Sequence, residues 1–90
     1  MDIEEIKLFL RVDGSDEDST ISGLQIAAEN YIGGAGVIKD YSNDLYKLAV
    51  KLLMAHWYEN REVIGKVDKL AFSLGDIIIN IKYNQVVVVV

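Results

Sequence analysis

The 90-residue chain contains no cysteine and no proline. Without cysteine it has no disulfide framework, no thiolate zinc site and no cysteine nucleophile. No apolar run reaches the ~18–20 residues of a membrane span, and the first residues, "MDIEEIKLFL", are acidic where a secretory signal needs basic residues. We therefore expect a soluble, intracellular domain that does not contact a membrane.

Basic residues are also scarce, with nine Lys and Arg against fourteen Asp and Glu and a net charge of −5. This balance disfavours tight binding of nucleic acid, because that affinity comes largely from basic side chains that displace counterions. Hydrophobic residues, in contrast, make up 51% of the chain. A domain of this size buries only about 60–65% of its unfolded surface, so part of its apolar surface is expected to meet a partner.

Two helices are predicted in the first third of the chain. Residues 2–11 read as a short helix with Asp2 as its N-cap, because an aspartate there can accept a hydrogen bond from the first turn. Residues 16–32 read as a second helix, for which Ser15 or Asp16 is the predicted cap. The "GGAG" that follows predicts a helix C-cap and then a mobile loop, since it lacks the spacing of a phosphate-binding motif.

The third predicted helix, 43–63, is the longest, with Ser42 or Asn43 as cap. At 100° per residue it has two adjacent apolar faces, the first made by Leu45, Leu48, Ala49, Leu52, Ala55 and His56 and the second by Tyr46, Val50, Leu53, Met54 and Trp57. A helix that is apolar over about two thirds of its circumference normally lies inside a large core. We therefore predict that the second face contacts another subunit. The predicted contact residues are Tyr46, Leu53 and Trp57, with Arg61 or Glu62 making charged contacts at the rim.

The fourth segment, "KLAFSLGDIIINIKY", is ambiguous between helix and strand. Its isoleucines favour a strand, whereas Ser73 followed by apolar residues at helical spacing favours a capped helix. The five valines 86–90 predict an extended, adhesive tail. The residues alone thus predict one domain over residues 1–85 that contains three helices, the longest of them central, and a fourth segment of open secondary structure, with a possible short extended segment at its C-terminus.

The stretch "AHWYENRE" at 55–62 is the strongest candidate for an active site. His56 and Glu59 are one helical turn apart, which is a possible metal half-site. His56, however, falls within the apolar arc and Glu62 lies about 120° from it around the helix. We predict a buried, hydrogen-bonded histidine, no catalytic residue, no metal and no cofactor.

Three stretches resemble tailed-phage and prophage head-tail connector proteins, small adaptors also described as DNA-packaging proteins. They are "IKLFLRVDGSDEDSTISGLQIAAENYI", "DLYKLAVKLLMAHWYENRE" and "LAFSLGDIIINIKY", which together cover most of residues 3–83. The most specific part is the "LRVDG" turn with its following "DED", combined with "AHWYENRE". The resemblance also implies that the fourth segment is at least partly helical. The expected fold is therefore mainly α, a small bundle of about four helices around one long central helix.

The resemblance implies a structural subunit that forms a ring of roughly a dozen copies under the portal protein. Such a ring extends the DNA channel, helps to retain packaged DNA and offers a docking surface to the next tail-side or head-completion protein. It would assemble in the bacterial cytoplasm and reside at the head-tail junction of the virion. The acidic balance suits a channel wall along which DNA slides without sequence-specific binding. Asp16, Glu17 and Asp18 are one group of candidate channel-lining residues, and Glu59 and Glu62 are another. The alternative is a small helical adaptor or regulator that binds a protein partner as a dimer.

Overall fold

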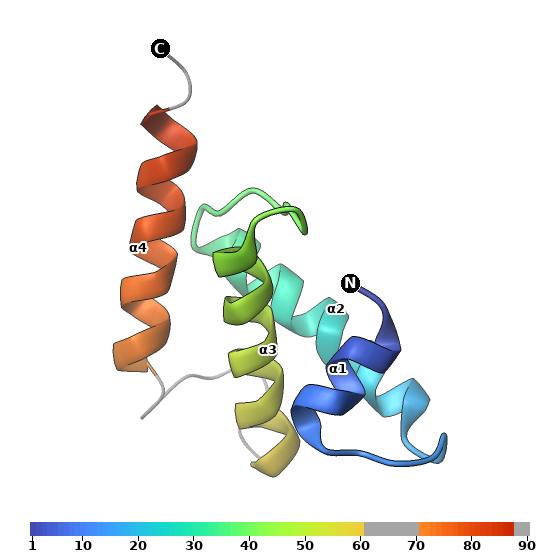
Figure 1. Cartoon of the computed structure of the whole chain (residues 1–90). Coiled ribbons are helices and arrows are strands. Elements are labelled where there is room, and N and C mark those ends of the chain that lie inside the picture. The colour runs from blue at the N-terminus through green and yellow to red at the C-terminus, as the bar shows by residue number, and fades with distance from the viewer. Residues whose placement is uncertain (61–70, 88–90) are drawn as a thin grey trace.

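Four helices make up the computed structural model, which describes residues 1–60 and 71–87. They are α1 (Ile3–Leu10), α2 (Asp18–Gly34), α3 (Asp44–Glu59) and α4 (Ala71–Val87), and these described ranges contain no strand. Figure 1 shows α3 between α4 and α1, with α2 crossing behind it. The predicted mainly α bundle with a central third helix is confirmed, although α3, at 16 residues, is no longer than the 17-residue α2 and α4.

The starts of α1 and α3 follow from short polar side chains. The Asp2 carboxylate accepts a hydrogen bond from the Glu5 N–H at 3.0 Å, as predicted. The Asn43 side chain accepts from the backbone N–H groups of Leu45 at 2.8 Å and Tyr46 at 3.2 Å, so Asn43 and not Ser42 is the cap. These bonds satisfy N–H groups that have no partner within the helix.

The start of α2 differs from the prediction. Its N-cap is Glu17, whose side chain makes no capping hydrogen bond, so neither Ser15 nor Asp16 has the predicted role. At its other end Gly33 and Gly34 belong to the last helical turn, and Gly36 follows with φ +96°. Ala35 within "GGAG" is the C-cap, so the predicted helix end is confirmed, and Gly36 after it adopts the left-handed backbone that glycine tolerates at no steric cost.

The isoleucine-rich fourth segment is helical. Leu74 and Ile81 are buried whereas Ile79 is 66% exposed, a pattern that places Ile79 and Ile81 on different sides of a helix and not on one side of a strand. The Gln85 side chain then holds the loop before α3, donating to the Ile38 carbonyl at 2.9 Å and accepting from its N–H at 3.1 Å. Helix α4 ends at Val87, within the predicted valine tail, and residues 88–90 lie outside the described residues.

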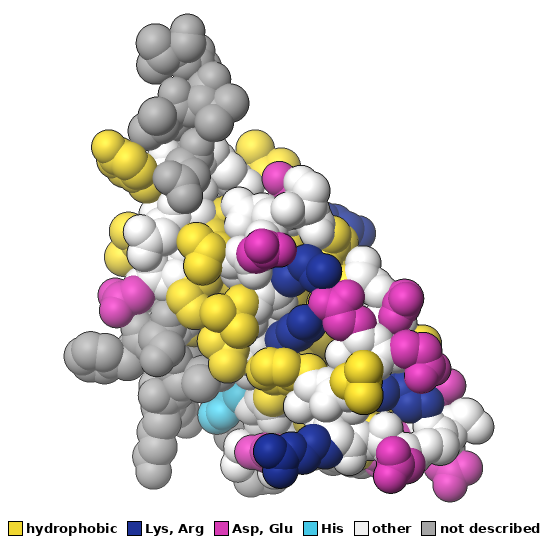
Figure 2. Space-filling model, viewed as in Figure 1, with side chains coloured by type: hydrophobic (Ala, Val, Ile, Leu, Met, Phe, Trp, Pro, Cys, Tyr) yellow, Lys and Arg dark blue, Asp and Glu magenta, His cyan; other side chains and the backbone are white. Residues whose placement is uncertain are grey.

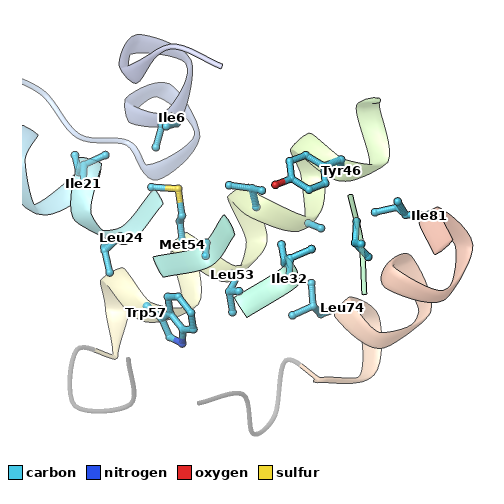
Figure 3. Packing of buried hydrophobic residues seen from close by; sticks show 14 residues of the cluster. Ile6, Ile21, Leu24, Ile32, Tyr46, Leu53, Met54, Trp57, Leu74 and Ile81 are labelled. Carbon is cyan, nitrogen blue, oxygen red and sulfur yellow. The ribbon is translucent and has the colours of Figure 1, made fainter. Parts of the chain in front are cut away.

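The core is formed where the other three helices pack against α3. Figure 3 shows Ile6 of α1, two groups of apolar side chains from α2 and α3, and Leu74 and Ile81 of α4. Trp57 and Tyr46 are the largest fully buried side chains. The aromatic rings pack edge to face, Trp57 against Tyr31 at 5.9 Å and Tyr46 against Tyr41 at 5.1 Å between centroids, the arrangement that aromatic pairs prefer.

Candidate functional site

Helix α3 has an inner face and an outer face, and the structure assigns them in the opposite way to the sequence prediction. Tyr46, Leu53 and Trp57 are exposed by only 1%, 0% and 0%, so they are enclosed by the subunit's own helices. The prediction that these three side chains face a neighbouring subunit is therefore wrong for this fold. We define the inner face by its buried residues, Tyr46, Ala49, Val50, Leu53, Met54 and Trp57.

Helix α2 and helix α4 explain this reversal. Ile21, Leu24, Ala28 and Ile32 of α2 supply a buried stripe at helical spacing that packs against α3. Helix α4 adds Leu74 and Ile81. Once α4 forms as a helix, the four-helix chain has enough apolar surface to cover the largest side chains of α3 by itself.

The outer face of α3 is an apolar surface that the other helices cover only in part. We define it by Leu45, Leu48, Leu52 and Ala55, whose spacing places them on one side of the helix. Leu48 is 37% exposed, and Leu52 and Ala55 are half-buried. In Figure 2 hydrophobic side chains gather over α3 and toward α4, while basic and acidic side chains lie toward α1.

Helix α1 extends this apolar surface at one edge. Phe9 is 40% exposed and Leu8 is 81% exposed, and the ammonium group of Lys51 lies 5.8 Å from the centre of the Phe9 ring. The Glu5 carboxylate bridges the ammonium groups of Lys51 at 2.7 Å and Lys47 at 3.1 Å. Hydrogen bonds from Lys51 and then Lys47 lower the pKa of Glu5. These contacts partly neutralise the two lysines beside the outer face.

The described residues thus form a helical domain with a partly exposed apolar face on its central helix. A family model described as phage gp6-like head-tail connector protein matches residues 1–82. The chain belongs to this head-tail connector family. Searches of curated proteins and of solved structures gave no match.

Membership of the connector family is consistent with a structural role at the head-tail junction of a virion. The match ends at residue 82, within α4, so it covers the first three helices and most of the fourth. Within the part of the chain that the structure describes, no helix is both long enough and apolar enough to span a bilayer.

Two of the three acidic residues in the first group predicted to line a connector channel hold the helices together. Asp18 forms an ion pair with Lys7 at 2.9 Å, and the Glu17 carboxylate accepts a hydrogen bond from the Tyr58 hydroxyl. Lys7 is only 8% exposed, and its hydrogen bond to Asp18 raises its pKa. Asp16 is exposed, so it is the member of the group whose charge faces solvent.

The other predicted rim residues, Arg61 and Glu62, lie outside the described residues. His56 is half-buried, and among the described residues its Nε2 atom has no hydrogen-bond partner, so the predicted hydrogen bond of this histidine is not found at that atom. In the described ranges no group of three His, Cys, Asp or Glu side chains could hold a metal ion. Glu59, the second half of the suspected site, is exposed.

The sequence prediction missed a polar cluster that fixes the loop between α2 and α3. The Tyr41 hydroxyl donates to the Glu29 carboxylate and accepts from the Gln25 side chain at 3.1 Å. Burial raises the pKa of Tyr41, and Lys39 lies 3.5 Å from the Glu29 carboxylate. No spacing rule links a loop tyrosine to a helix residue twelve positions earlier, so no sequence signal for this cluster exists.

Proposed function

We propose that this connector forms a ring beneath the portal protein, extends the DNA channel, helps to retain packaged DNA and offers a docking surface to the next tail-side protein. The family match over residues 1–82 supports a head-tail connector role. The subunit would assemble in the bacterial cytoplasm before it joins the virion.

The observation that best supports the proposed ring is the partly exposed outer face of α3. Leu48 and Leu52 expose apolar surface that would gain roughly 25 cal/mol for each Å² removed from water. A helix of 16 residues is about 24 Å long, so one such face is smaller than the ~800 Å² per partner of a standard stable interface. Contacts between two isolated copies should therefore be weak, and ring closure or the portal surface should add the remaining stability.

The charge of the chain supports a channel that DNA passes without binding tightly. Its net charge is −5, and Asp13 and Asp16 in the loop before α2 are both exposed. A negative wall repels phosphate, whereas a basic wall would hold the DNA in place. We propose that Asp16 faces the lumen, while Glu17 and Asp18 serve mainly to fasten the helices.

Negative-stain electron microscopy of the purified protein, alone and with portal protein, tests this function. Ring-shaped particles are the expected result, and light scattering at high protein concentration should give the matching mass. A population that remains dimeric under both conditions would favour the helical adaptor. Monomers alone, with and without portal protein, would contradict ring formation.

A further inference from the structure

A second uncharged surface lies on the outward side of α2. Ile26 is 59% exposed. On the same side the helix carries Gly23, Asn30 and Gly34, which are also exposed. We call Gly23, Ile26, Asn30 and Gly34 the α2 face. Tyr31, whose ring packs against Trp57, and Ala27, which packs against the core, lie at its edge toward α3.

The α2 face is uncharged because the charged residues of this helix point elsewhere. Asp18 pairs with Lys7 of α1, and Glu29 accepts from Tyr41 and lies near Lys39. All the other residues of α2 are uncharged. In a chain whose net charge is −5 and of which 26% is charged, a 17-residue helix with an uncharged outward side is unusual.

The α2 face and the outer face of α3 lie on opposite sides of the subunit. Helices α2 and α3 pack against each other through their buried stripes, as their contacts show. The outward side of each helix therefore points away from the other helix. In Figure 1 α2 lies behind α3.

We propose that the outer face of α3 in one copy packs against the α2 face of the next copy. This inference depends on the proposed ring, and it names the two surfaces that join the subunits. Two different faces on opposite sides of one subunit give a head-to-tail contact, which closes into a ring when the rotation between copies allows it. A contact between two α3 faces would instead give a closed dimer.

Charge favours a second copy of the chain as the occupant. Two chains of net charge −5 repel each other, so they can approach closely only through surfaces that carry little charge. Between Asp44 and Glu59 the outer face of α3 offers only leucine and alanine. A basic partner would be attracted to acidic surfaces such as the loop that holds Asp13 and Asp16.

The shapes of the two faces also complement each other. Leu48 and Leu52 are large side chains at the centre of the outer face. On the α2 face a Cβ atom added to Gly23 or Gly34 would meet no atom within 4 Å. Near Gly34 the surface has a hollow of about 420 Å³, lined by Asn30, Tyr31, Gly34 and Ala35. Exposed small residues let a neighbouring helix approach closely, and the leucines could fill the space.

The test uses one charged substitution on each face. Leu48→Glu disables the outer face of α3, and Ile26→Glu disables the α2 face; both side chains are exposed, so each variant should keep the fold. We expect each variant alone to self-associate at least tenfold more weakly than the unmodified chain. Mixed in equal amounts they should form a heterodimer that cannot grow, because each contributes one intact face. Analytical ultracentrifugation over a range of concentrations measures all three species.

Ile79→Glu is the matched control. Ile79 is 66% exposed, but it lies on α4 beside Asp76 and Lys82, on a charged surface. This variant should form rings like the unmodified chain. Circular dichroism should show native helix content for all three variants.

Several outcomes would overturn the pairing. They are normal rings from Ile26→Glu or from Leu48→Glu, and a mixture that stays monomeric at protein concentrations at which the unmodified chain self-associates. Because the unmodified chain still forms rings in those cases, they leave the proposed function intact. Failure of the unmodified chain to form rings with portal protein would contradict the proposed function itself.

Discussion

The inner and outer faces of α3 are both apolar, yet the fold treats them differently. The inner face holds Trp57, Tyr46 and Met54, all buried, whereas the outer face holds leucine and alanine that remain partly in contact with water. Burying the face with the larger side chains removes more apolar surface from water. The difference teaches that this small domain with two apolar faces buries the larger face in its own core and leaves the smaller face partly in contact with water, where we propose that assembly occurs.

The strongest test of this contrast is Trp57→Ala. Trp57 is fully buried, so the substitution should lower the free energy of unfolding by about 3–5 kcal/mol. Urea unfolding followed by circular dichroism measures this loss, because the substitution removes the single tryptophan that fluorescence would report. If the free energy of unfolding fell by less than ~1 kcal/mol and assembly were impaired, Trp57 would belong to the subunit interface and not to the core.

Leu53 and Leu52 form a matched pair on opposite faces of α3. Leu53 is 0% exposed and Leu52 is half-buried. Leu53→Ala should cost about 2–5 kcal/mol of monomer stability, and Leu52→Ala about 1 kcal/mol, since only part of its side chain leaves water. Chemical denaturation of the two monomers compares them directly. Equal losses would mean that both faces are core.

Asn43→Ala tests what sets the start of α3. The side chain caps two backbone N–H groups, so its loss should lower the free energy of unfolding by about 1 kcal/mol. Ser42→Ala is the control and should have a smaller effect, because the Ser42 hydroxyl donates only to Asp40 outside the helix. Thermal unfolding of both variants provides the comparison. If Ser42→Ala proved more harmful, the cap would be misassigned.

Glu5→Gln tests the charged edge beside the outer face. Because the folded pKa of Glu5 lies below its ordinary value of 4.5, its stabilising contribution is fully present above that pH. The contribution is lost as the pH falls through the folded pKa. The stability difference between the unmodified chain and the variant should therefore be small, be largest near neutral pH and shrink below pH 4.5. Acid titration of unfolding measures it, with Glu4→Gln, at an exposed neighbouring position, as control.

The sequence patterns predict the helices well and their orientation poorly. Asp2 is recognisable as a cap, and the two apolar faces of α3 can be read from spacing. Periodicity shows which residues share a face, but it does not show which face another helix will cover. Which face is covered depended on α4, because α4 packs against α3. The isoleucines of α4 made a helix and a strand equally possible from the sequence. The larger side chains of the inner face were the available signal.

The acidic group before α2 shows a second limit. Capping rules consider contacts within one helix, so Ser15 and Asp16 are the expected caps and Asp18 is an ordinary first-turn residue. The fold instead pairs Asp18 with Lys7 and Glu17 with Tyr58. The second pair joins residues 41 positions apart. Such pairs depend on tertiary packing, which spacing alone does not give.

The ion pair between Lys7 and Asp18 also provides a chemical reporter of whether α1 is docked. Amine reagents attack the uncharged, accessible form of lysine, and Lys7 is buried with a raised pKa, whereas the Lys39 side chain is 62% exposed. In the folded subunit Lys7 should therefore be acetylated much more slowly than Lys39. Mass spectrometry of briefly acetylated protein, as a free subunit and after assembly, would show whether α1 keeps its place when the ring forms.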